Sequence, residues 1–296
     1  MNNSISQKPA IGDWIILLVI SLIWGSSFIL MKKGLVAFPP TQVASMRIFL
    51  TMLTMSPFVV MSLKRVSRKD LLPIAVVAIM GNGFPPFLFT AAQMRLNSSA
   101  AGVLNSLTPV FVFLLGVLFF KMAFKWKRLI GVFVGFMGAV ILILFATPHS
   151  QTGESEYIYG LYVILASLCY SVSVNVMKTY CQNIHPIALN MTIFMILGPF
   201  AGIYLFSTNF VSIFHDNPMA WQSFGYIVIL AVFGTALATI LFFKLTQRTD
   251  ALFSSTVTYL IPIFAVLWGF WDGEMIGWSY LVGLTCILTG VYLAGK

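Results

Sequence analysis

The chain has 296 residues, of which 59% are hydrophobic and only 8% are charged, and its mean hydropathy is +0.95. Soluble domains carry about 25% charged residues, so this chain is too apolar to cover a surface that faces water, and we expect it to span a lipid bilayer. The formal charge of +9 would suit a nucleic-acid partner, but the basic residues are scattered between apolar runs and form no patch, which argues against that class.

Ten stretches of the sequence are apolar over about 20 residues, the length that crosses the hydrocarbon core of a bilayer. The polar start of the chain leads into an apolar run from Trp14 to Met31. This run is too long for a cleavable signal and lacks a cleavage site, so we expect it to be the first retained span. The expected spans are residues 14–31, 41–62, 71–91, 98–119, 128–147, 158–178, 187–207, 222–243, 251–271 and 278–295.

Lysine and arginine residues indicate how these spans are oriented. With the N-terminus in the cytoplasm, 13 of the 17 basic residues fall in segments on that side, three fall on the other side, and Arg47 lies within a span. Positive charges accumulate in cytoplasmic loops. We therefore expect both termini to be cytoplasmic, in a multi-pass protein of the cell (inner) membrane.

The two halves of the chain resemble each other. Four positions of the fourth span recur 153 residues later in the ninth span, where Leu107, Pro109, Phe111 and Gly116 match Leu260, Pro262, Phe264 and Gly269. Each half contains five expected spans, an odd number, so the second half enters the membrane from the opposite side and the repeat is inverted. We expect an all-α membrane protein of ten helices, with one five-helix repeat in residues 1–147, a connection in 148–157 and a second repeat in 158–296.

Prolines within the spans predict interruptions of the helices. Each proline removes a backbone donor and frees the carbonyl four residues earlier, which lipid cannot satisfy. Such carbonyls should face a neighbouring helix or a water-filled cavity, although for any single proline a packing kink closed by a nearby hydroxyl is the alternative. The expected helix breaks or hinges are Gly81, Pro85, Pro86, Pro109 and Pro262.

Polar and aromatic side chains at similar depth are the expected substrate contacts. Hydroxyl and amide groups also link helices within membranes, so interhelical hydrogen bonding is the competing interpretation for each of them. A buried amide has four hydrogen bonds to satisfy, and a tryptophan at mid-span favours a cavity over the membrane interface. The expected substrate-binding residues are Trp24, Ser26, Asn82, Asn105, Tyr170, Thr235 and Tyr259.

Charged residues are almost excluded from the spans. Arg47 is the one charge well inside a span, and its depth also allows it to snorkel outwards, so we assign it a gating or structural role ahead of direct substrate contact. None of the eight acidic residues lies near mid-span, which argues against cation–proton antiport and favours a neutral or zwitterionic substrate. Glu274, at the outer end of the ninth span, is expected to act in an outer gate or as a helix cap.

The fifth and tenth spans differ from the others because they carry glycines and few polar side chains. Small residues at these spacings let helices approach closely. We expect these spans to be peripheral packing helices or the face of a homodimer, through Gly131, Gly135, Gly138, Gly283 and Gly290.

Short motifs occur in a set order along the chain. They are Trp24-Gly25-Ser26-Ser27-Phe28 in the first span, Arg47 in the second, Pro109 and Pro262 in the fourth and ninth, Gly234-Thr235-Ala236 in the eighth, and Glu274 after the ninth. In these motifs the chain resembles the drug/metabolite transporter superfamily, most closely its EamA-type exporters, over nearly its whole length. Lys121 departs from the glutamate that the family has after the fourth span. The resemblance implies a central cavity lined by spans one, three, four, six, eight and nine, and export of amino acids or related metabolites.

These observations predict a secondary transporter, not an enzyme, that exports a small neutral or zwitterionic metabolite, an amino acid or an analogue, by alternating access of its two halves. Its expected partners are this substrate and the bilayer, with no nucleic acid, metal or cofactor. Uncoupled facilitated diffusion is the alternative. An intramembrane enzyme would need a catalytic constellation, but His149, His185 and His215 lie in connections without metal-ligand spacing. A non-transporting scaffold would tolerate apolar replacements of its mid-span polar residues.

Overall fold

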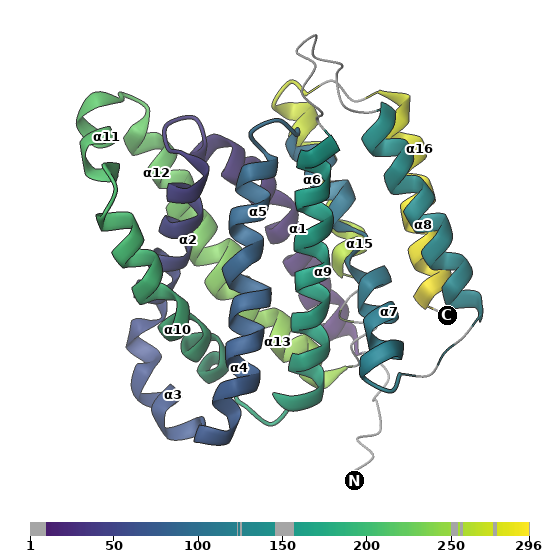
Figure 1. Ribbon diagram of the computed structural model, residues 1–296, viewed down its shortest axis with the longest axis horizontal. Coiled ribbons are helices and arrows are strands. Elements are labelled where there is room, and N and C mark those ends of the chain that lie inside the picture. The colour runs from purple at the N-terminus through teal and green to yellow at the C-terminus, as the bar shows by residue number, and fades with distance from the viewer. Residues whose placement is uncertain are drawn as a thin grey trace.

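The computed structural model describes residues 10–122, 124, 126–145, 157–249, 254, 257–274 and 277–295. Within these ranges every regular element is a helix, and most of the helices run side by side in one bundle (Figure 1). The α-helices are α1 (Ile11–Gly34), α2 (Pro40–Met55), α3 (Val59–Arg65), α4 (Leu71–Ala78), α5 (Phe84–Ala92), α6 (Ser98–Asn105), α7 (Thr108–Phe119), α8 (Trp126–Phe145), α9 (Tyr157–Tyr180), α10 (Pro186–Phe206), α11 (Phe210–Asp216), α12 (Ala220–Ile229), α13 (Ala238–Arg248), α15 (Val257–Trp271) and α16 (Trp278–Gly295).

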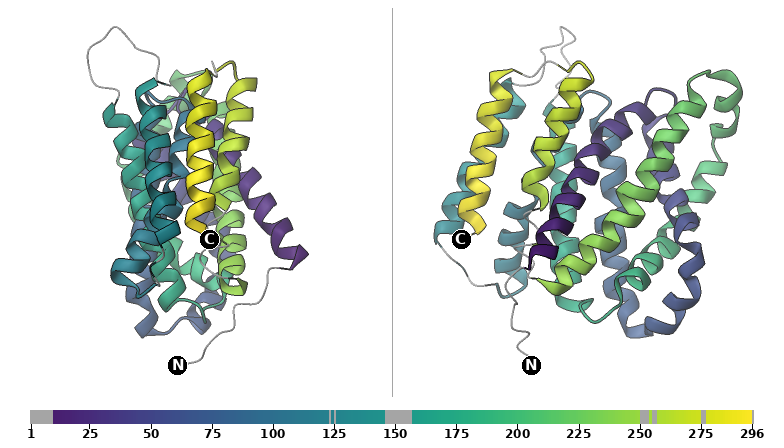
Figure 2. Two further views of the ribbon diagram at one scale, coloured as in Figure 1. Left: turned by 90° about the vertical axis from the view of Figure 1, so that its right-hand side faces the viewer. Right: turned by 180° about the vertical axis from the view of Figure 1, so that it is seen from behind.

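Several helical stretches have the length and composition of membrane spans. Among the described residues, six are long and apolar enough to cross a bilayer, namely Ile11–Gly34, Arg68–Ala92, Ser98–Phe119, Ile158–Tyr180, Pro186–Phe206 and Ala220–Arg248. The chain is a multi-pass membrane protein. Its division into ten spans and two inverted repeats stays a prediction, although α1 begins and α16 ends toward the same end of the bundle (Figure 2).

Three of the expected spans are interrupted near their middle. The π-helix Ile79–Gly83 separates α4 from α5, and the π-helix Leu230–Leu237 separates α12 from α13. In the fourth expected span, α6 ends at Asn105 and α7 begins at Thr108 after a short turn. Short π-helical segments are frequent at functional sites, so these interruptions mark the middle of the spans as the place to look for one.

Most of the residues predicted to break helices lie at these interruptions. Gly81 is in the first π-helix, Pro85 and Pro86 are in the first turn of α5, and Pro109 is in the first turn of α7. A proline in the first helical turn removes an N–H that has no partner within the helix. Pro262 differs, because it lies inside α15 and the helix continues through it.

The first long helix of each half packs chiefly against the other half of the chain. Helix α1 packs against α15, α12 and α13, whereas α9 packs against α5, α7 and α4. Helix α2 packs against α10 and the second π-helix. The two halves are therefore interleaved at the centre of the bundle, and side chains of both face the same interior.

Helices α8 and α16 form a pair at one edge of the bundle (Figures 1 and 2). They pack mainly against each other, and Gly131, Gly138, Gly283 and Gly290 are buried. The burial of Gly135 lies outside the described part of the structure. The glycines allow close approach of two helices within one chain, and a homodimer through this face stays a prediction.

Candidate functional site

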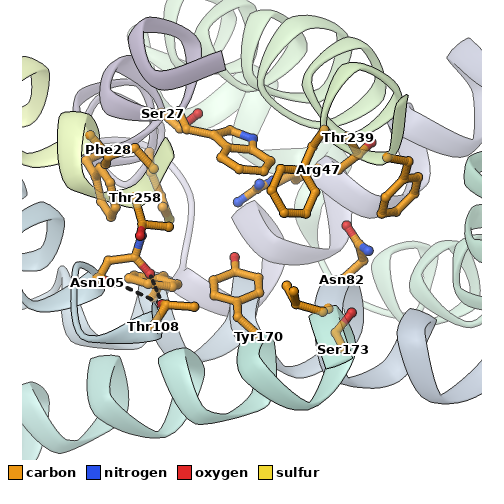
Figure 3. Close-up of a pocket in the computed structure, with 18 residues that line it drawn as sticks. Ser27, Phe28, Arg47, Asn82, Asn105, Thr108, Tyr170, Ser173, Thr239 and Thr258 are labelled. Atoms are coloured by element: carbon orange, nitrogen blue, oxygen red, sulfur yellow. Dashed lines mark hydrogen bonds between the residues drawn. The ribbon is translucent and has the colours of Figure 1, made fainter. Parts of the chain in front are cut away.

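A cavity lies between the two halves of the chain (Figure 3). About 120 Å³ of the cavity can hold the centre of a water molecule, which is room for several waters or a small ligand. Trp24 and Tyr170 line it from the middle of two 24-residue helices, α1 and α9. The cavity is therefore at mid-depth of the bundle.

Four of the seven predicted substrate contacts line this cavity. They are Trp24 on α1, Asn82 in the first π-helix, Asn105 on α6 and Tyr170 on α9. Gly81, predicted as a hinge, lines it as well, and a Cβ at this position would collide with Ser173 of α9. Glycine thus lets the π-helix approach α9 closely at the cavity wall.

The other three predicted contacts are placed differently. Ser26 donates to the carbonyl of Leu22 and accepts a hydrogen bond of 2.8 Å from the indole of Trp268, so it links α1 to α15 away from the cavity. Thr235 is buried behind Arg47 and is not among the lining residues. The side chain of Tyr259 lies outside the described part of the structure.

Several lining residues were missed by the sequence analysis, although helical spacing would have found them. Ser173 follows Tyr170 by three residues and Phe28 follows Trp24 by four, so each shares a helix face with a predicted contact. Thr239, Phe242 and Phe243 line the cavity from α13 and were not singled out. Reading i+3 and i+4 neighbours of each predicted contact would have extended the list.

Trp24, on α1 of the first half, is held in place by the second half of the chain. Its indole N–H donates to the carbonyl of Gly234, in the second π-helix, over 3.0 Å, and its ring contacts Phe242 with centroids 5.1 Å apart. The indole nitrogen is therefore occupied by the protein. The ring face, not the N–H, is what Trp24 offers to a ligand.

The break before Pro109 is closed locally. The hydroxyl of Thr108 donates to the carbonyl of Asn105 over 2.8 Å, and this is the carbonyl that Pro109 leaves without its helical donor. The same hydroxyl lies 3.3 Å from Oδ1 of Asn105. Pro109 therefore matches the alternative given for single prolines above, a kink whose freed carbonyl is closed by a nearby hydroxyl.

Arg47 lies on the cavity wall, on α2. Its Nε donates to the hydroxyl of Thr235 over 2.7 Å, and that hydroxyl lies 3.2 Å from the carbonyl of Leu230. Among the described residues that line the cavity, Arg47 is the only charged one. The interruption of the helix at Leu230–Leu237 thus positions a hydroxyl that orients the guanidinium.

Polar groups from several elements point into the cavity without a partner in the described part of the protein. The side-chain amide of Asn82, the hydroxyl of Tyr170 and the terminal nitrogens of Arg47 make no hydrogen bond within these residues (Figure 3). These groups reach the open space of the cavity, where a ligand or water can supply the hydrogen bonds that the described residues do not. No group of three or more potential metal ligands occurs among the described residues.

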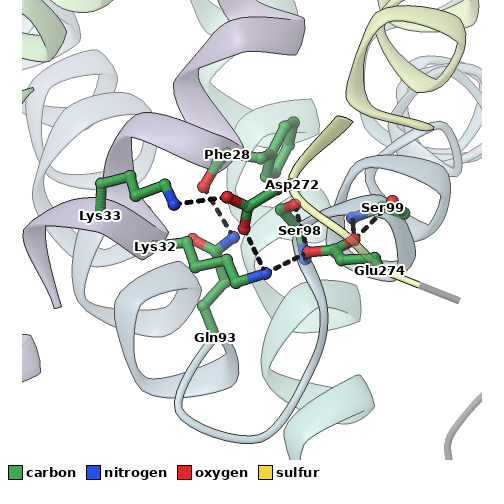
Figure 4. Close-up of polar contacts among 8 residues, drawn as sticks. All are labelled: Phe28, Lys32, Lys33, Gln93, Ser98, Ser99, Asp272 and Glu274. Carbon is green, nitrogen blue, oxygen red and sulfur yellow. Dashed lines mark hydrogen bonds and ion pairs between the residues drawn. The ribbon is translucent and has the colours of Figure 1, made fainter. Parts of the chain in front are cut away.

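A second polar cluster lies beyond one end of the cavity, beginning one turn after Phe28 of α1 (Figure 4). We call it the Lys32 cluster, and its members are Lys32, Lys33, Gln93, Ser98, Ser99, Asp272 and Glu274. The Lys32 ammonium lies 2.8 Å from both Asp272 and Glu274, and Lys33 pairs with Asp272. These ion pairs join α1 to the turn that follows α15.

Glu274 also caps the N-terminus of α6. Its carboxylate accepts the backbone N–H groups of Ser98 and Ser99, at 3.0 and 3.2 Å, and their hydroxyls, at 2.7 and 2.6 Å. A negative charge is favourable at this end of a helix. One carboxylate therefore ties together α1, α6 and the end of α15.

The acidic side chains of this cluster are ionised near neutral pH. Burial alone would raise the pKa of Glu274, but hydrogen bonds from Lys32, Ser99 and Ser98 outweigh it and the pKa lies below its usual value. Asp272 behaves alike, because hydrogen bonds from Lys32 and Lys33 outweigh burial and lower its pKa. The cluster is thus a set of charged pairs and not a set of neutral acids.

A multi-pass helical bundle with a cavity at mid-depth that is lined by aromatic and polar side chains, and a charged cluster across one end of it, has the construction of a membrane transporter. The sequence comparison identifies which kind. The chain belongs to the EamA-like transporter family, whose model matches residues 11–144 and 158–295. It is a transporter and not an enzyme.

Named relatives cover most of the chain. An uncharacterized transporter of Archaeoglobus fulgidus is 23% identical over 95% of this chain and 97% of its own length. The S-adenosylmethionine/S-adenosylhomocysteine transporter of Chlamydia trachomatis serovar L2 is 24% identical over 94% of this chain and 86% of its own length. A crystal structure superposes with a TM-score of 0.65 at 16% identity, covering 96% of both chains, and this likeness concerns the fold alone.

Proposed function

We propose that the protein is a secondary transporter of the cell (inner) membrane that exports a small neutral or zwitterionic metabolite, an amino acid or an analogue. The observation that carries the proposal is the mid-depth cavity between the two halves, with open polar groups from α2, the first π-helix and α9. A substrate held there touches both halves, so a rocking motion of one half against the other exposes it to one side at a time.

The Lys32 cluster is the proposed outer gate. It joins α1, in the first half, to Asp272 and Glu274, in the second half, beyond the cavity. Opening this end requires the contacts of the Lys32 cluster between the two halves to break. It does not require any cavity residue to leave its own helix. With the orientation expected from the basic residues, this end faces away from the cytoplasm.

The relatives support the substrate class in general terms. S-adenosylmethionine and S-adenosylhomocysteine, which appear in the name of the Chlamydia relative, are derivatives of amino acids. The second is a zwitterion, whereas the sulfonium of the first gives it a net positive charge. The described cavity walls of this chain contain aromatic rings, amides and hydroxyls and no carboxylate, which favours a substrate without a net positive charge. The lack of a carboxylate in these walls also keeps uncoupled facilitation as the second candidate.

Transport into proteoliposomes tests the proposal. Purified protein is reconstituted, and counterflow of each of the twenty radiolabelled amino acids is measured with and without an imposed pH gradient. Asn82→Ala should reduce flux of the transported amino acid at least tenfold, because the amide has no other task among the described residues, while Asn183→Ala, which removes an exposed amide from a connection, should not.

The outcomes separate the candidates. Flux that responds to the pH gradient supports coupled transport, and flux that ignores it supports the facilitator. If Asn82→Ala and Tyr259→Ala both leave flux at the level of the Asn183→Ala control, the proposed substrate site is wrong.

A further inference from the structure

Arg47 brings a positive charge to the cavity, and no acidic residue in the described part of the chain lies beside it. The described acidic residues all lie at the ends of the bundle: Asp13 lies near Arg248, Asp70 caps a short turn, Asp216 ends α11, and Asp272 and Glu274 pair with lysines. The groups that the structure places against Arg47 are the hydroxyls of Thr235 and Tyr170, and neither is a carboxylate.

The guanidinium is oriented so that its free edge faces the open space. Its Nε is engaged by Thr235, which leaves the two terminal nitrogens with no partner among the described residues. Arg47 and the hydroxyl of Tyr170 point toward the same part of the cavity (Figure 3). A ligand atom placed there meets donors from both halves of the chain.

An isolated charge at this depth is costly, because the surrounding protein and lipid solvate it poorly. A guanidinium with two free terminal nitrogens matches a carboxylate in shape, since two parallel N–H groups meet two oxygens. A phosphate dianion fits less well, because one arginine would leave a net negative charge in a wall that has no second cation among the described residues.

We propose that Arg47 binds the carboxylate of the transported molecule and thereby determines the substrate class: amino acids, held through their carboxylate, and not the corresponding amides or amines. The proposal rests on the transport function above and assigns Arg47 a direct contact in place of the gating or structural role expected from the sequence. The rest of the substrate lies among the amide of Asn82, the hydroxyl of Tyr170 and the aromatic faces of Trp24 and Phe242.

Binding to the detergent-purified protein tests this inference without requiring transport. The probes are the twenty amino acids and, for each one that raises the melting temperature, the matching amino-acid amide, which lacks only the carboxylate. Wild-type protein should bind the amino acid about 10- to 100-fold more tightly than the amide, the range expected for a charge-assisted bidentate pair.

Arg47→Gln should remove this preference, so that amino acid and amide bind alike, and Arg47→Lys should keep part of it because the charge stays and the two-pronged geometry is lost. Arg95→Gln is the matched control, since it removes an exposed arginine outside the cavity and should leave the preference unchanged. The comparison of acid with amide uses wild-type protein, so it remains decisive if Arg47→Gln does not fold.

Equal binding of acid and amide by the wild-type protein overturns the inference, and so does a set of probes in which no amino acid binds at all. Carboxylate-selective binding without flux in proteoliposomes would leave the role of Arg47 standing and refute the transport proposal. If the flux of acid and of amide is the same in Arg47→Gln as in the wild type, the transport proposal stands and the proposed role of Arg47 is refuted.

Discussion

Replacing Glu274 by glutamine is expected to loosen the Lys32 cluster. Glu274 is only 8% exposed and accepts hydrogen bonds from Lys32, Ser98 and Ser99. Removing one partner of a buried ion pair costs about 3–5 kcal/mol. Lys32 keeps its pairing with Asp272 and its side chain is 35% exposed, so we reduce the expected cost to about 1–3 kcal/mol. This corresponds to a shift of about 5- to 150-fold toward a state that is open at the Lys32 end.

Thiol accessibility measures this shift. Ser27→Cys places a thiol on the cavity wall, at a residue that is 6% exposed, in a background where Cys169, Cys181 and Cys286 are replaced by alanine. A charged, membrane-impermeant methanethiosulfonate is added from the side of the Lys32 cluster. Glu274→Gln should accelerate labelling by the factor given above.

The control is Asp216→Asn, which neutralises an exposed acidic residue at the end of α11. It should label at the rate of the parent. If folded Glu274→Gln also labels at the rate of the parent, the Lys32 cluster does not hold this end of the cavity closed, and the proposed gate is wrong.

Three further results are expected. Gly269→Ala should lower the melting temperature and accelerate the same labelling, because a Cβ there would collide with Ser99 and with the carboxylate of Glu274. The pKa values of Asp272 and Glu274 are lower in the folded state than their unfolded values of about 4, so ionisation of these groups stabilises the fold at higher pH. The melting temperature should therefore be level from pH 8 to about pH 5 and fall below about pH 4. A Glu274→Gln variant whose melting temperature falls equally steeply below about pH 4 would contradict this. Trp24→Phe should destabilise the protein by about 1 kcal/mol in reversible denaturation, since the carbonyl of Gly234 loses its donor, and a variant as stable as the parent would show that this bond contributes nothing.

The sequence predicts the location of the cavity better than the orientation of individual side chains around it. Asn82 and Asn105 are found by depth and by the cost of burying an amide, and both line the cavity. Ser26 and Thr235 have the same depth and chemistry but face Trp268 and Arg47. Hydropathy gives the depth of a residue along a helix, whereas the rotation of that helix depends on what its neighbours bury.

For Arg47 as well, the sequence gives the depth of the side chain but not its direction. The sequence shows a charge inside a span and leaves two directions open, outward to the interface or inward to the bundle. The direction is decided by Thr235, which is 188 positions away in the chain and is presented by the second π-helix. The π-helix shifts the register of the helix, and composition and periodicity do not encode such a shift.

The two ends of the bundle differ in their charges. In the expected repeat, Met31-Lys32 of the first span matches Met177-Lys178 of the sixth, and Lys121 matches Glu274, which lies 153 positions later. Lys32 pairs with Glu274 across the two halves, whereas Lys178 donates to the carbonyls of Thr246 and Thr249, within its own half, over 3.1 and 3.0 Å. An acid at position 121 is what a matching latch would need, and the chain has a lysine there.

This difference between positions 121 and 274 predicts a resting state closed at the Lys32 end, and Lys121→Glu tests it by placing an acid at the position that corresponds to Glu274. If an acid there strengthens closure of the opposite end, the proposed alternating access requires that labelling of S27C from the Lys32 side should rise. Lys121→Gln is the control, since it removes the positive charge without adding a partner, and it should have a smaller effect. Equal labelling of Lys121→Glu and Lys121→Gln would show that the acid at this end has no latching partner, and the asymmetry would then not set the resting state.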